Sequence, residues 1–212
     1  MDGEAIEVKG VGAERSATDR LLAKRLSSGD TKALTEIVKS WQAPLERYLT
    51  RLCGGCKGDK DEILQEVFLK VYRHANLYDP ALPFSAWIYR ICRNEMASRM
   101  RLKTGSLEAG EIPDEVAESI WGTVVDLPDA HLSSKEDARM IGEVVNAMPD
   151  KFRDVFILRF LEEKDYAEIG DILQENVNTV ATRIRRAREW FMEHAKARGL
   201  VEPSSESSKG GR

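Results

Sequence analysis

Apolar residues recur every three or four positions along most of the chain, which is the spacing of amphipathic α-helices. The stripe within residues 61–74 consists of Ile63, Leu64, Val67, Phe68, Val71 and Tyr72. The stripe within residues 86–103 consists of Trp87, Ile88, Ile91, Cys92 and Met96. Such stripes face a core. The pattern therefore predicts two packed helices joined by an irregular loop over 76–84 that contains prolines.

The same periodicity predicts further helices on both sides of this central pair. One is expected from Thr18 to the Gly29-Asp30 break, and a longer one from Thr31 to Leu52, where Pro44 is a candidate kink. Helical spacing returns over 136–148, 149–161, 166–173 and 176–197. We therefore expect an all-α chain with two small helical domains, over residues 17–103 and 136–200.

The segments outside these domains lack helical periodicity. Residues 1–16 and 201–212 are predicted to be disordered tails. Residues 104–135 form an acidic linker with a single basic residue, Lys135. The simplest interpretation is a solvated, self-repelling, flexible tether. A small apolar cluster inside it is a candidate docking anchor and consists of Ile120, Trp121, Val124 and Val125.

The net charge of −4 argues against a uniformly basic coat that would bind nucleic acid along the whole chain. Charge is segregated, however, because basic residues concentrate in 87–103 and 176–198. No apolar run has the length of a membrane span, and the N-terminus lacks a hydrophobic signal core. We therefore expect a cytoplasmic protein with local nucleic-acid-binding patches and no membrane partner.

The three cysteines argue against a disulfide framework, because their number is odd and the chain has no export signal. Cys53 and Cys56 form a lone C-x-x-C pair without further ligands at metal spacing. We interpret this pair as a glycine-rich turn with incidental thiols. The sequence therefore predicts no metal, no cofactor, no catalytic residue and no small-molecule substrate.

The outer faces of the two central helices carry opposite charge. A leucine among polar side chains favours a partner surface over a solvated one, and this predicted docking face consists of Glu62, Gln65, Glu66 and Leu69. The second helix has a basic outer face, with Arg90, Arg93, Asn94, Arg99 and Arg101. Tyr78 and Tyr89 add flat rings on which unpaired bases stack. Trp87 begins the apolar stripe and is more typical of a core residue.

Residues 166–191 have the pattern of a helix-turn-helix. A short helix is followed by the turn Gln174-Glu175, and Asn176 is a typical cap for the last helix. In the major groove, arginine binds guanine with two hydrogen bonds, and threonine contacts a thymine methyl or a phosphate. The side chains predicted to face DNA are Asn178, Thr179, Thr182, Arg183, Arg185 and Arg186. Of these, Arg185 suits phosphates, as does Arg188.

Two stretches resemble conserved regions of one family. QEVFLKVYR followed by FSAWIYRICRN resembles region 2 of bacterial RNA polymerase sigma factors, most closely those of the extracytoplasmic-function subfamily. YAEIGDIL followed by TVATRIRRARE resembles region 4 of the same family. The family commonly has alanine at the position of Gly170, glycine at that of Asn178 and a polar or basic residue at that of Ala181.

The resemblance implies a promoter-specificity factor without catalytic activity. It implies that the predicted docking face binds the clamp helices of the largest polymerase subunit, and that the second domain meets the polymerase flap. It implies further that Asn94 and its neighbours bind the minus-ten element as a single strand, with Tyr78 beside a flipped base, while region 4 binds the minus-thirty-five duplex. An anti-sigma factor is the expected inhibitor. For the acidic linker, the resemblance adds a second interpretation, a nucleic-acid mimic inside the polymerase.

Two other classes of function compete with this interpretation. A stand-alone helix-turn-helix regulator would explain residues 166–191 but would leave the pattern of 61–103 without a role. An enzyme would use Cys53 and Cys56 together with a histidine, but no such constellation occurs at ligand spacing.

Overall fold

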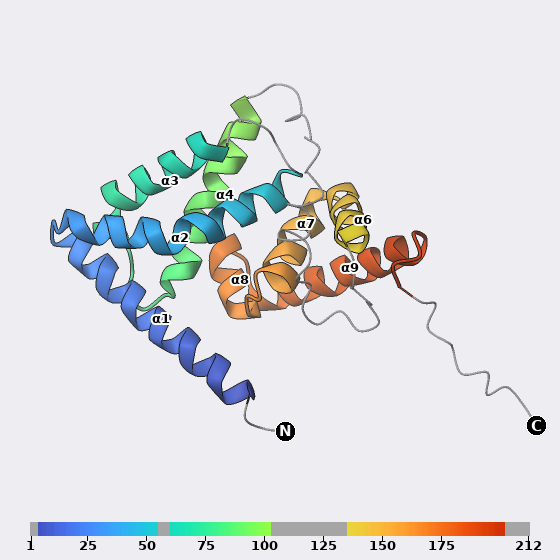
Figure 1. The fold of residues 1–212 in the computed structure, drawn as a ribbon, viewed down its shortest axis with the longest axis horizontal. Helices are drawn as coiled ribbons and strands as arrows, with labels where there is room; N and C mark the ends of the chain where they lie inside the picture. Colours follow the sequence, from blue (N-terminus) through green and yellow to red (C-terminus); the bar gives the residue numbers. More distant parts are fainter. Residues whose placement is uncertain (1–3, 55–59, 103–134, 202–212) are drawn as a thin grey trace, which may run out of the picture.

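The computed structural model describes residues 4–54, 60–102 and 135–201. In the first domain α1 (Glu4–Ser27) and α2 (Thr31–Leu52) form a helical hairpin. Then α3 (Lys60–Arg73), the single turn η1 (Ala75–Leu77) and α4 (Phe84–Leu102) complete the bundle (Figure 1). The break between α1 and α2 is fixed by Asp30, whose side chain accepts a hydrogen bond from the Lys32 N–H at 3.0 Å. This is the usual way in which an aspartate begins a helix.

The second domain consists of α6 (Lys135–Ala147), α7 (Asp150–Phe156), η2 (Ile157–Leu161), α8 (Tyr166–Leu173) and α9 (Val177–Lys196). Here η2 is a π-helical turn that continues directly from α7, so a single predicted helix over 149–161 changes its pitch midway. The long helix α9 contacts α6, α7 and α8. Its buried stripe runs to Ala195 and includes Phe191, whose ring stacks on that of Phe156 with centroids 4.7 Å apart. The second domain is therefore a small bundle built around α9.

The two domains lie against each other, as Figure 1 shows where α8 approaches α4. Further contacts join α2 to α6 and to η2. The buried apolar residues of both domains belong to one continuous cluster, from Leu22 to Val201. The prediction of two small helical domains is thus confirmed, and the described residues place these domains in direct contact.

One local prediction differs from the structure. Residues 1–16 were expected to be disordered, but α1 already begins at Glu4, so Thr18 lies inside a helix and caps none. Each residue added to an existing helix forms one more backbone hydrogen bond. This favours extension of α1 toward the N-terminus from its packed turns at 19–26. Pro44 lies inside α2, which continues through it. Of the predicted linker 104–135, residues 104–134, to which both proposed roles belong, lie outside the described residues, and Lys135 begins α6. None of the described helices is long and apolar enough to cross a membrane.

Candidate functional site

The predicted docking residues line one groove. It lies between α3 and α4, has a volume of about 360 Å³, and is lined by Glu62, Ile63, Gln65, Glu66, Leu69, Glu95, Ser98 and Arg99. Leu69 is 44 % exposed, although large apolar side chains are normally buried. The structure therefore brings Glu62, Gln65, Glu66 and Leu69 together around an accessible apolar centre.

Ion pairs hold the walls of this groove. Arg99 of α4 donates a hydrogen bond to Glu62 of α3, and Lys70 pairs with Glu95 across the same two helices. The Arg99–Glu62 contact joins a residue predicted to bind the minus-ten strand to one predicted to bind the polymerase. Among the described residues, Glu66 has only a distant partner, Arg73, at 3.9 Å, so its carboxylate is available to a basic partner.

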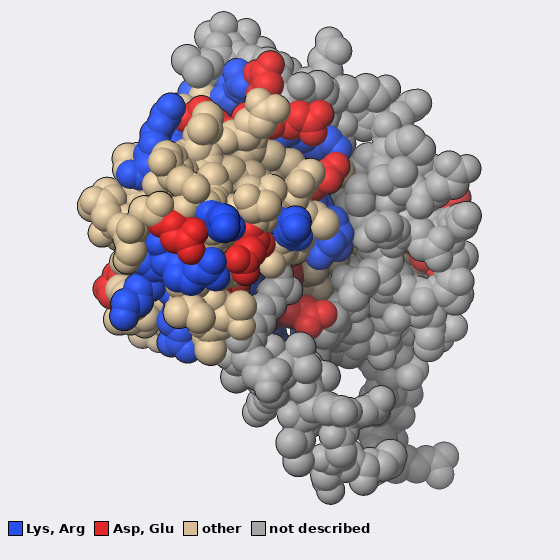
Figure 2. All heavy atoms as spheres, turned by 60° about the vertical axis from the view of Figure 1, so that its left-hand side comes forward, with Lys and Arg blue, Asp and Glu red and all other residues tan. Residues whose placement is uncertain are grey.

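An apolar hollow continues from the groove toward α2. It has a volume of about 490 Å³ and is lined by Thr31, Leu34, Gln65, Phe68, Leu69 and Tyr72. Leu69 belongs to both hollows, and Tyr72 is 47 % exposed. Figure 2, which turns this side of the molecule forward, shows a broad area of uncharged side chains bordered by groups of both signs. The surface combines accessible apolar area with a charged rim, which is the usual anatomy of a protein interface.

The basic face of α4 is only partly accessible. Asn94 and Arg101 are exposed, and Arg90 is partly exposed. Arg93, by contrast, donates a 2.6 Å hydrogen bond from Nε to Asp154 of the second domain. Tyr89 is 2 % exposed, so the flat surface expected of its ring is absent in this conformation. The described arrangement covers part of the predicted minus-ten surface with the second domain.

The loop before α4 is held by Tyr78. Its hydroxyl donates a 2.8 Å hydrogen bond to the carbonyl of Leu82, and its ring packs on Phe84 and Trp87 with centroids 5.5 and 5.3 Å apart. Trp87 is 6 % exposed, which confirms its prediction as a core residue. Tyr78 itself is 8 % exposed, so it supports the loop from within.

The outer face of α9 is accessible over its first turns. Asn178, Thr179, Thr182 and Arg186 are exposed. Arg185 pairs with Glu189 at 2.6 Å on the helix surface. Arg183 differs from the others, because its guanidinium binds Glu175 and the carbonyl of Lys151. Arg183 therefore ties α9 to the start of α7, a role that the sequence did not reveal.

The start of α9 is fixed mainly by backbone geometry. Asn176 accepts a hydrogen bond from the Asn178 N–H at 2.9 Å, which confirms the predicted cap. Gln174 adopts a left-handed conformation (φ 57°), and this turns the chain out of α8. A Cβ atom on Gly170 would lie 2.9 Å from the carbonyl oxygen of Glu175, closer than such atoms approach. Glycine at position 170 therefore permits the tight approach of the turn to α8.

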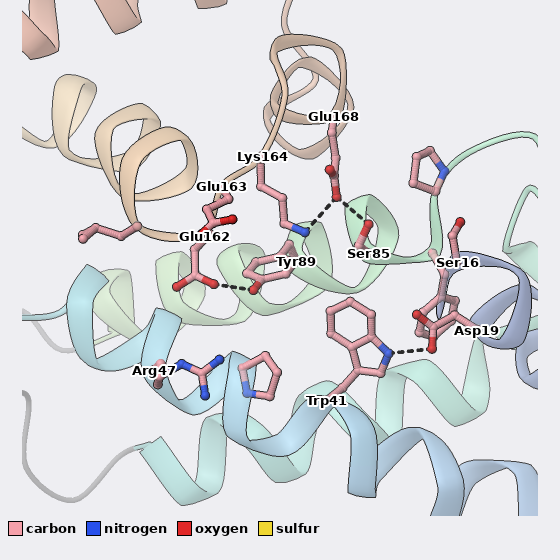
Figure 3. A pocket seen from close by; sticks show the side chains of 14 residues that line it. Ser16, Asp19, Trp41, Arg47, Ser85, Tyr89, Glu162, Glu163, Lys164 and Glu168 are labelled. Atoms are coloured by element: carbon pink, nitrogen blue, oxygen red, sulfur yellow. Dashed lines mark hydrogen bonds and ion pairs between the residues drawn. The ribbon is translucent and has the colours of Figure 1, made fainter. Parts of the chain in front are cut away.

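A cavity of about 630 Å³ opens between the two domains (Figure 3). Figure 3 shows the carboxylate of Glu162 directed at the Tyr89 hydroxyl, and Glu168 between Lys164 and Ser85. The sequence did not reveal these contacts, and of the groups involved only Tyr89 was singled out there, as part of an accessible DNA-binding face. Two residues could have indicated a buried charged interface: Asp154, within the apolar run 152–161, and Arg51, near the end of α2. A charged residue in an apolar stripe indicates a buried partner.

Burial changes the acid–base properties of this interface. It raises the pKa of both Tyr48 and Tyr89 well above the usual tyrosine value, and the Glu162 carboxylate beside Tyr89 adds to the effect. Burial also raises the pKa of Asp154, although the guanidinium of Arg93 opposes this shift, and it lowers the pKa of Arg51 against the attraction of Glu162. In each of these four groups, burial is the largest cause and disfavours the charged form.

We expect Tyr48 and Tyr89 to remain protonated at a pH where exposed tyrosines ionise. Because their pKa is raised in the folded state, the stability they contribute is present below about pH 10, the unfolded value, and is lost as pH rises through the folded value. The ultraviolet absorbance of tyrosinate during an alkaline titration measures this. In Tyr89→Phe, one fewer tyrosine should ionise at the high-pH end of the titration. An unchanged number would contradict the raised pKa of Tyr89.

The cysteines require one correction. Cys53 is disulfide-bonded, so its interpretation as an incidental thiol is wrong, while Cys92 is free and fully buried. Cys56 lies outside the described residues. Within the described ranges, no group of three or more histidine, cysteine, aspartate or glutamate side chains is placed to hold a metal ion.

Family models match both domains of the chain. The model described as "Sigma-70 region 2" matches residues 37–105, and "Sigma-70, region 4" matches residues 138–191. Solved structures share the fold. One is CnrH in complex with the cytosolic domain of CnrY, with a TM-score of 0.63 and 22 % identity, covering 85 % of this chain and 98 % of that one. Another is the sigma factor RpoE in complex with the anti-sigma factor NepR from Bartonella quintana, with a TM-score of 0.58 and 19 % identity, covering 78 % and 98 %.

Curated relatives are similar over most of their length. The ECF RNA polymerase sigma factor SigW of Bacillus subtilis is 32 % identical over 171 residues, which is 78 % of this chain and 90 % of that protein. The ECF RNA polymerase sigma-E factor of Haemophilus influenzae is 31 % identical, covering 81 % and 92 %, and that of Escherichia coli K12 is 30 % identical, covering 81 % and 91 %. With both regions in order on a helical fold of the same kind, this chain belongs to the extracytoplasmic-function sigma factors of bacterial RNA polymerase.

Proposed function

We propose that this chain binds core RNA polymerase through the groove between α3 and α4. The observation that carries the proposal is the convergence of Glu62, Gln65, Glu66 and the exposed Leu69 on that groove. Carboxylates around an apolar centre suit a basic helical partner, because charge-assisted hydrogen bonds fix its register while the leucine fills its apolar side. The clamp helices of the largest subunit are the proposed partner, and the flap is the proposed partner of the second domain.

The accessible face of α9 is the proposed reader of the minus-thirty-five duplex. Asn178, Thr179, Thr182 and Arg186 are exposed at its N-terminal half, the part of a recognition helix that meets base edges. Arg185, at the side, suits a phosphate. Arg183 enters this proposal as a positioning residue, since its guanidinium is occupied by Glu175 and Lys151.

The basic face of α4 is the proposed reader of the minus-ten strand. Arg90, Asn94 and Arg101 are accessible in the described conformation, whereas Tyr89, Arg93 and Arg99 are engaged with protein groups. Tyr78 is the proposed wall of a pocket for an unstacked base, because it packs the loop 78–84 onto α4. Arginine and aromatic groups together offset the loss of base pairing when DNA opens.

An anti-sigma factor is the proposed inhibitor, and the cytoplasm is the proposed site of action. CnrH and the Bartonella quintana RpoE are described in complex with CnrY and with an anti-sigma factor, respectively. The accessible apolar hollow beside Leu69 and Tyr72 is the proposed contact, so inhibitor and polymerase would compete. A candidate inhibitor must therefore reduce transcription in proportion to its displacement of this chain from core polymerase.

The test is run-off transcription with purified core polymerase and a library of genomic fragments from the same cell. Adding the chain should produce transcripts from discrete start sites that share two spaced sequence elements. Core polymerase alone and the chain alone are the controls. If the chain associates with core polymerase and no start-site selection appears on any fragment, the proposal is wrong.

A further inference from the structure

Charged side chains of the second domain are buried against α2 and α4 of the first. The Glu162 carboxylate accepts one hydrogen bond from Arg51 Nη1 and one from the Tyr89 hydroxyl, both at 2.6 Å. The side chains of Arg51 and Glu162 are only 4 % and 5 % exposed. Two charges removed from water to this extent demand good geometry, which these contacts have.

The backbone around Glu162 is shaped for this contact. The π-helical turn η2 ends at Leu161, whose carbonyl accepts a second hydrogen bond from Arg51 Nη1 at 2.9 Å. Glu163 then adopts a left-handed conformation (φ 55°), which is unfavourable for a residue with a side chain. Single π-helical turns and residues in such conformations concentrate at functional positions. The unfavourable backbone conformation is offset by the hydrogen bonds that Glu162 accepts from Arg51 and Tyr89.

Two further contacts cover the same face of α4. Arg93 donates a 2.6 Å hydrogen bond to Asp154, and Ser85 donates one to Glu168. Ser85, Tyr89 and Arg93 are spaced by four residues, so they form one stripe along α4. The second domain therefore closes over a continuous stripe of the helix that carries the proposed minus-ten surface.

The other two proposed surfaces remain accessible in this closed arrangement. Leu69, at the docking groove, is 44 % exposed, and Thr179 and Arg186 on α9 are exposed. Tyr89 and Arg93 are the proposed strand-binding residues that the second domain occupies directly. The closed arrangement therefore permits polymerase docking and duplex binding but obstructs capture of the single strand.

The closed interface has a defined geometry, but it includes buried polar groups that destabilise it. Asp154 Oδ1 and the Tyr48 hydroxyl are buried and have no hydrogen-bond partner among the residues that the structure describes. Each such group loses hydration without replacement, which destabilises the closed arrangement. Buried ion pairs add little net stability, because desolvation offsets their attraction. An interface of this kind defines one geometry and still allows the domains to separate.

We infer that the contact of Glu162 with Arg51 and Tyr89 is an autoinhibitory latch. While it is closed, the chain docks on polymerase and presents α9, but the Ser85–Tyr89–Arg93 stripe does not capture the melted strand. Separation of the second domain from α4 frees this stripe. The inference rests on the proposed function for its consequence, but the latch itself is a property of the free chain.

The first test measures the free chain by small-angle X-ray scattering. Glu162→Gln keeps the size of the side chain and removes its charge, so the radius of gyration should rise as the domains separate. Tyr89→Phe, which loses one hydrogen bond, should give a smaller rise. Glu163→Gln is the matched control, one residue along and exposed, and should leave the radius unchanged. Circular dichroism verifies that each variant is folded. An unchanged radius in folded Glu162→Gln overturns the latch.

The second test locks the latch. Ser85→Cys combined with Glu168→Cys is joined by a short bis-methanethiosulfonate reagent, which a reductant removes again. The joined protein should still associate with core polymerase but lose promoter-specific run-off transcription about tenfold or more, with recovery on reduction. Each single cysteine variant treated with the same reagent is the control. Equal transcription by joined and reduced protein overturns the inference. If the reduced and natural proteins both fail to select start sites, the proposed function is wrong, and the scattering result still decides whether the latch exists.

Discussion

Glu66→Lys is expected to abolish association with core RNA polymerase. Glu66 lines the α3–α4 groove with Leu69, and within the described part of the chain its carboxylate meets one basic group, Arg73 at 3.9 Å. Reversing its charge replaces an attraction to a basic partner with a repulsion, and like charges placed together at an interface cost several kcal/mol. Size-exclusion chromatography of the variant with purified core polymerase measures the association, and run-off transcription should fail in parallel.

The matched control for this variant is Glu46→Lys. Glu46 is exposed on α2 and does not line the groove or the adjoining apolar hollow. Its substitution by lysine changes the net charge by the same amount as Glu66→Lys. This variant should co-elute with core polymerase as the natural chain does. Co-elution of Glu66→Lys to the same extent would reject the groove as the docking face. Loss of binding in both variants would indicate that overall charge, and not this groove, governs association.

Arg186→Ala is expected to weaken recognition of the minus-thirty-five duplex by about 1–3 kcal/mol, the worth of a bidentate base contact. Arg186 is exposed on the accessible face of α9. The loss should be confined to one base pair of the element, so that preference at that position relaxes. Competition binding by the polymerase complex, with duplexes that vary one position at a time, measures both the loss and its location.

Two other arginines of α9 serve as comparisons. Arg185 pairs with Glu189, and Arg185→Ala should weaken binding to all duplexes alike, as the loss of a phosphate contact does. Arg183 was predicted to face DNA, but its guanidinium binds Glu175 and the Lys151 carbonyl. Arg183→Ala should therefore affect all sequences through the position of α9. A loss confined to one base pair in Arg183→Ala, with none in Arg186→Ala, would reverse these roles.

The helices were predictable from the sequence because their signals are local. Apolar spacing identified α2, α3, α4 and α9, and the caps at Asp30 and Asn176 lie where a side-chain oxygen precedes an apolar stripe. The grouping of the proposed docking residues was predictable for the same reason. Glu62, Gln65, Glu66 and Leu69 lie on one helix, so their spacing alone places them on one face.

The domain interface was not predictable, because its contacts join residues far apart in the chain. Arg51 and Glu162 are separated by more than half of the sequence, and no local pattern links them. Tyr89 was assigned to an accessible face, since a single helix does not reveal that a second domain covers it. The π-helical turn at 157–161 was missed because its apolar residues also fit an ordinary helix.

The close approach at Gly170 has a consequence for how binding preference can change. Main-chain atoms of α8 and of the turn contribute to the orientation of α9, through Gly170, Glu175 and the left-handed Gln174. The exposed residues at 178, 179, 182 and 186 take little part in that orientation. In the proposed role of α9, these side chains can therefore be exchanged one at a time to change the target sequence without changing the orientation of the helix.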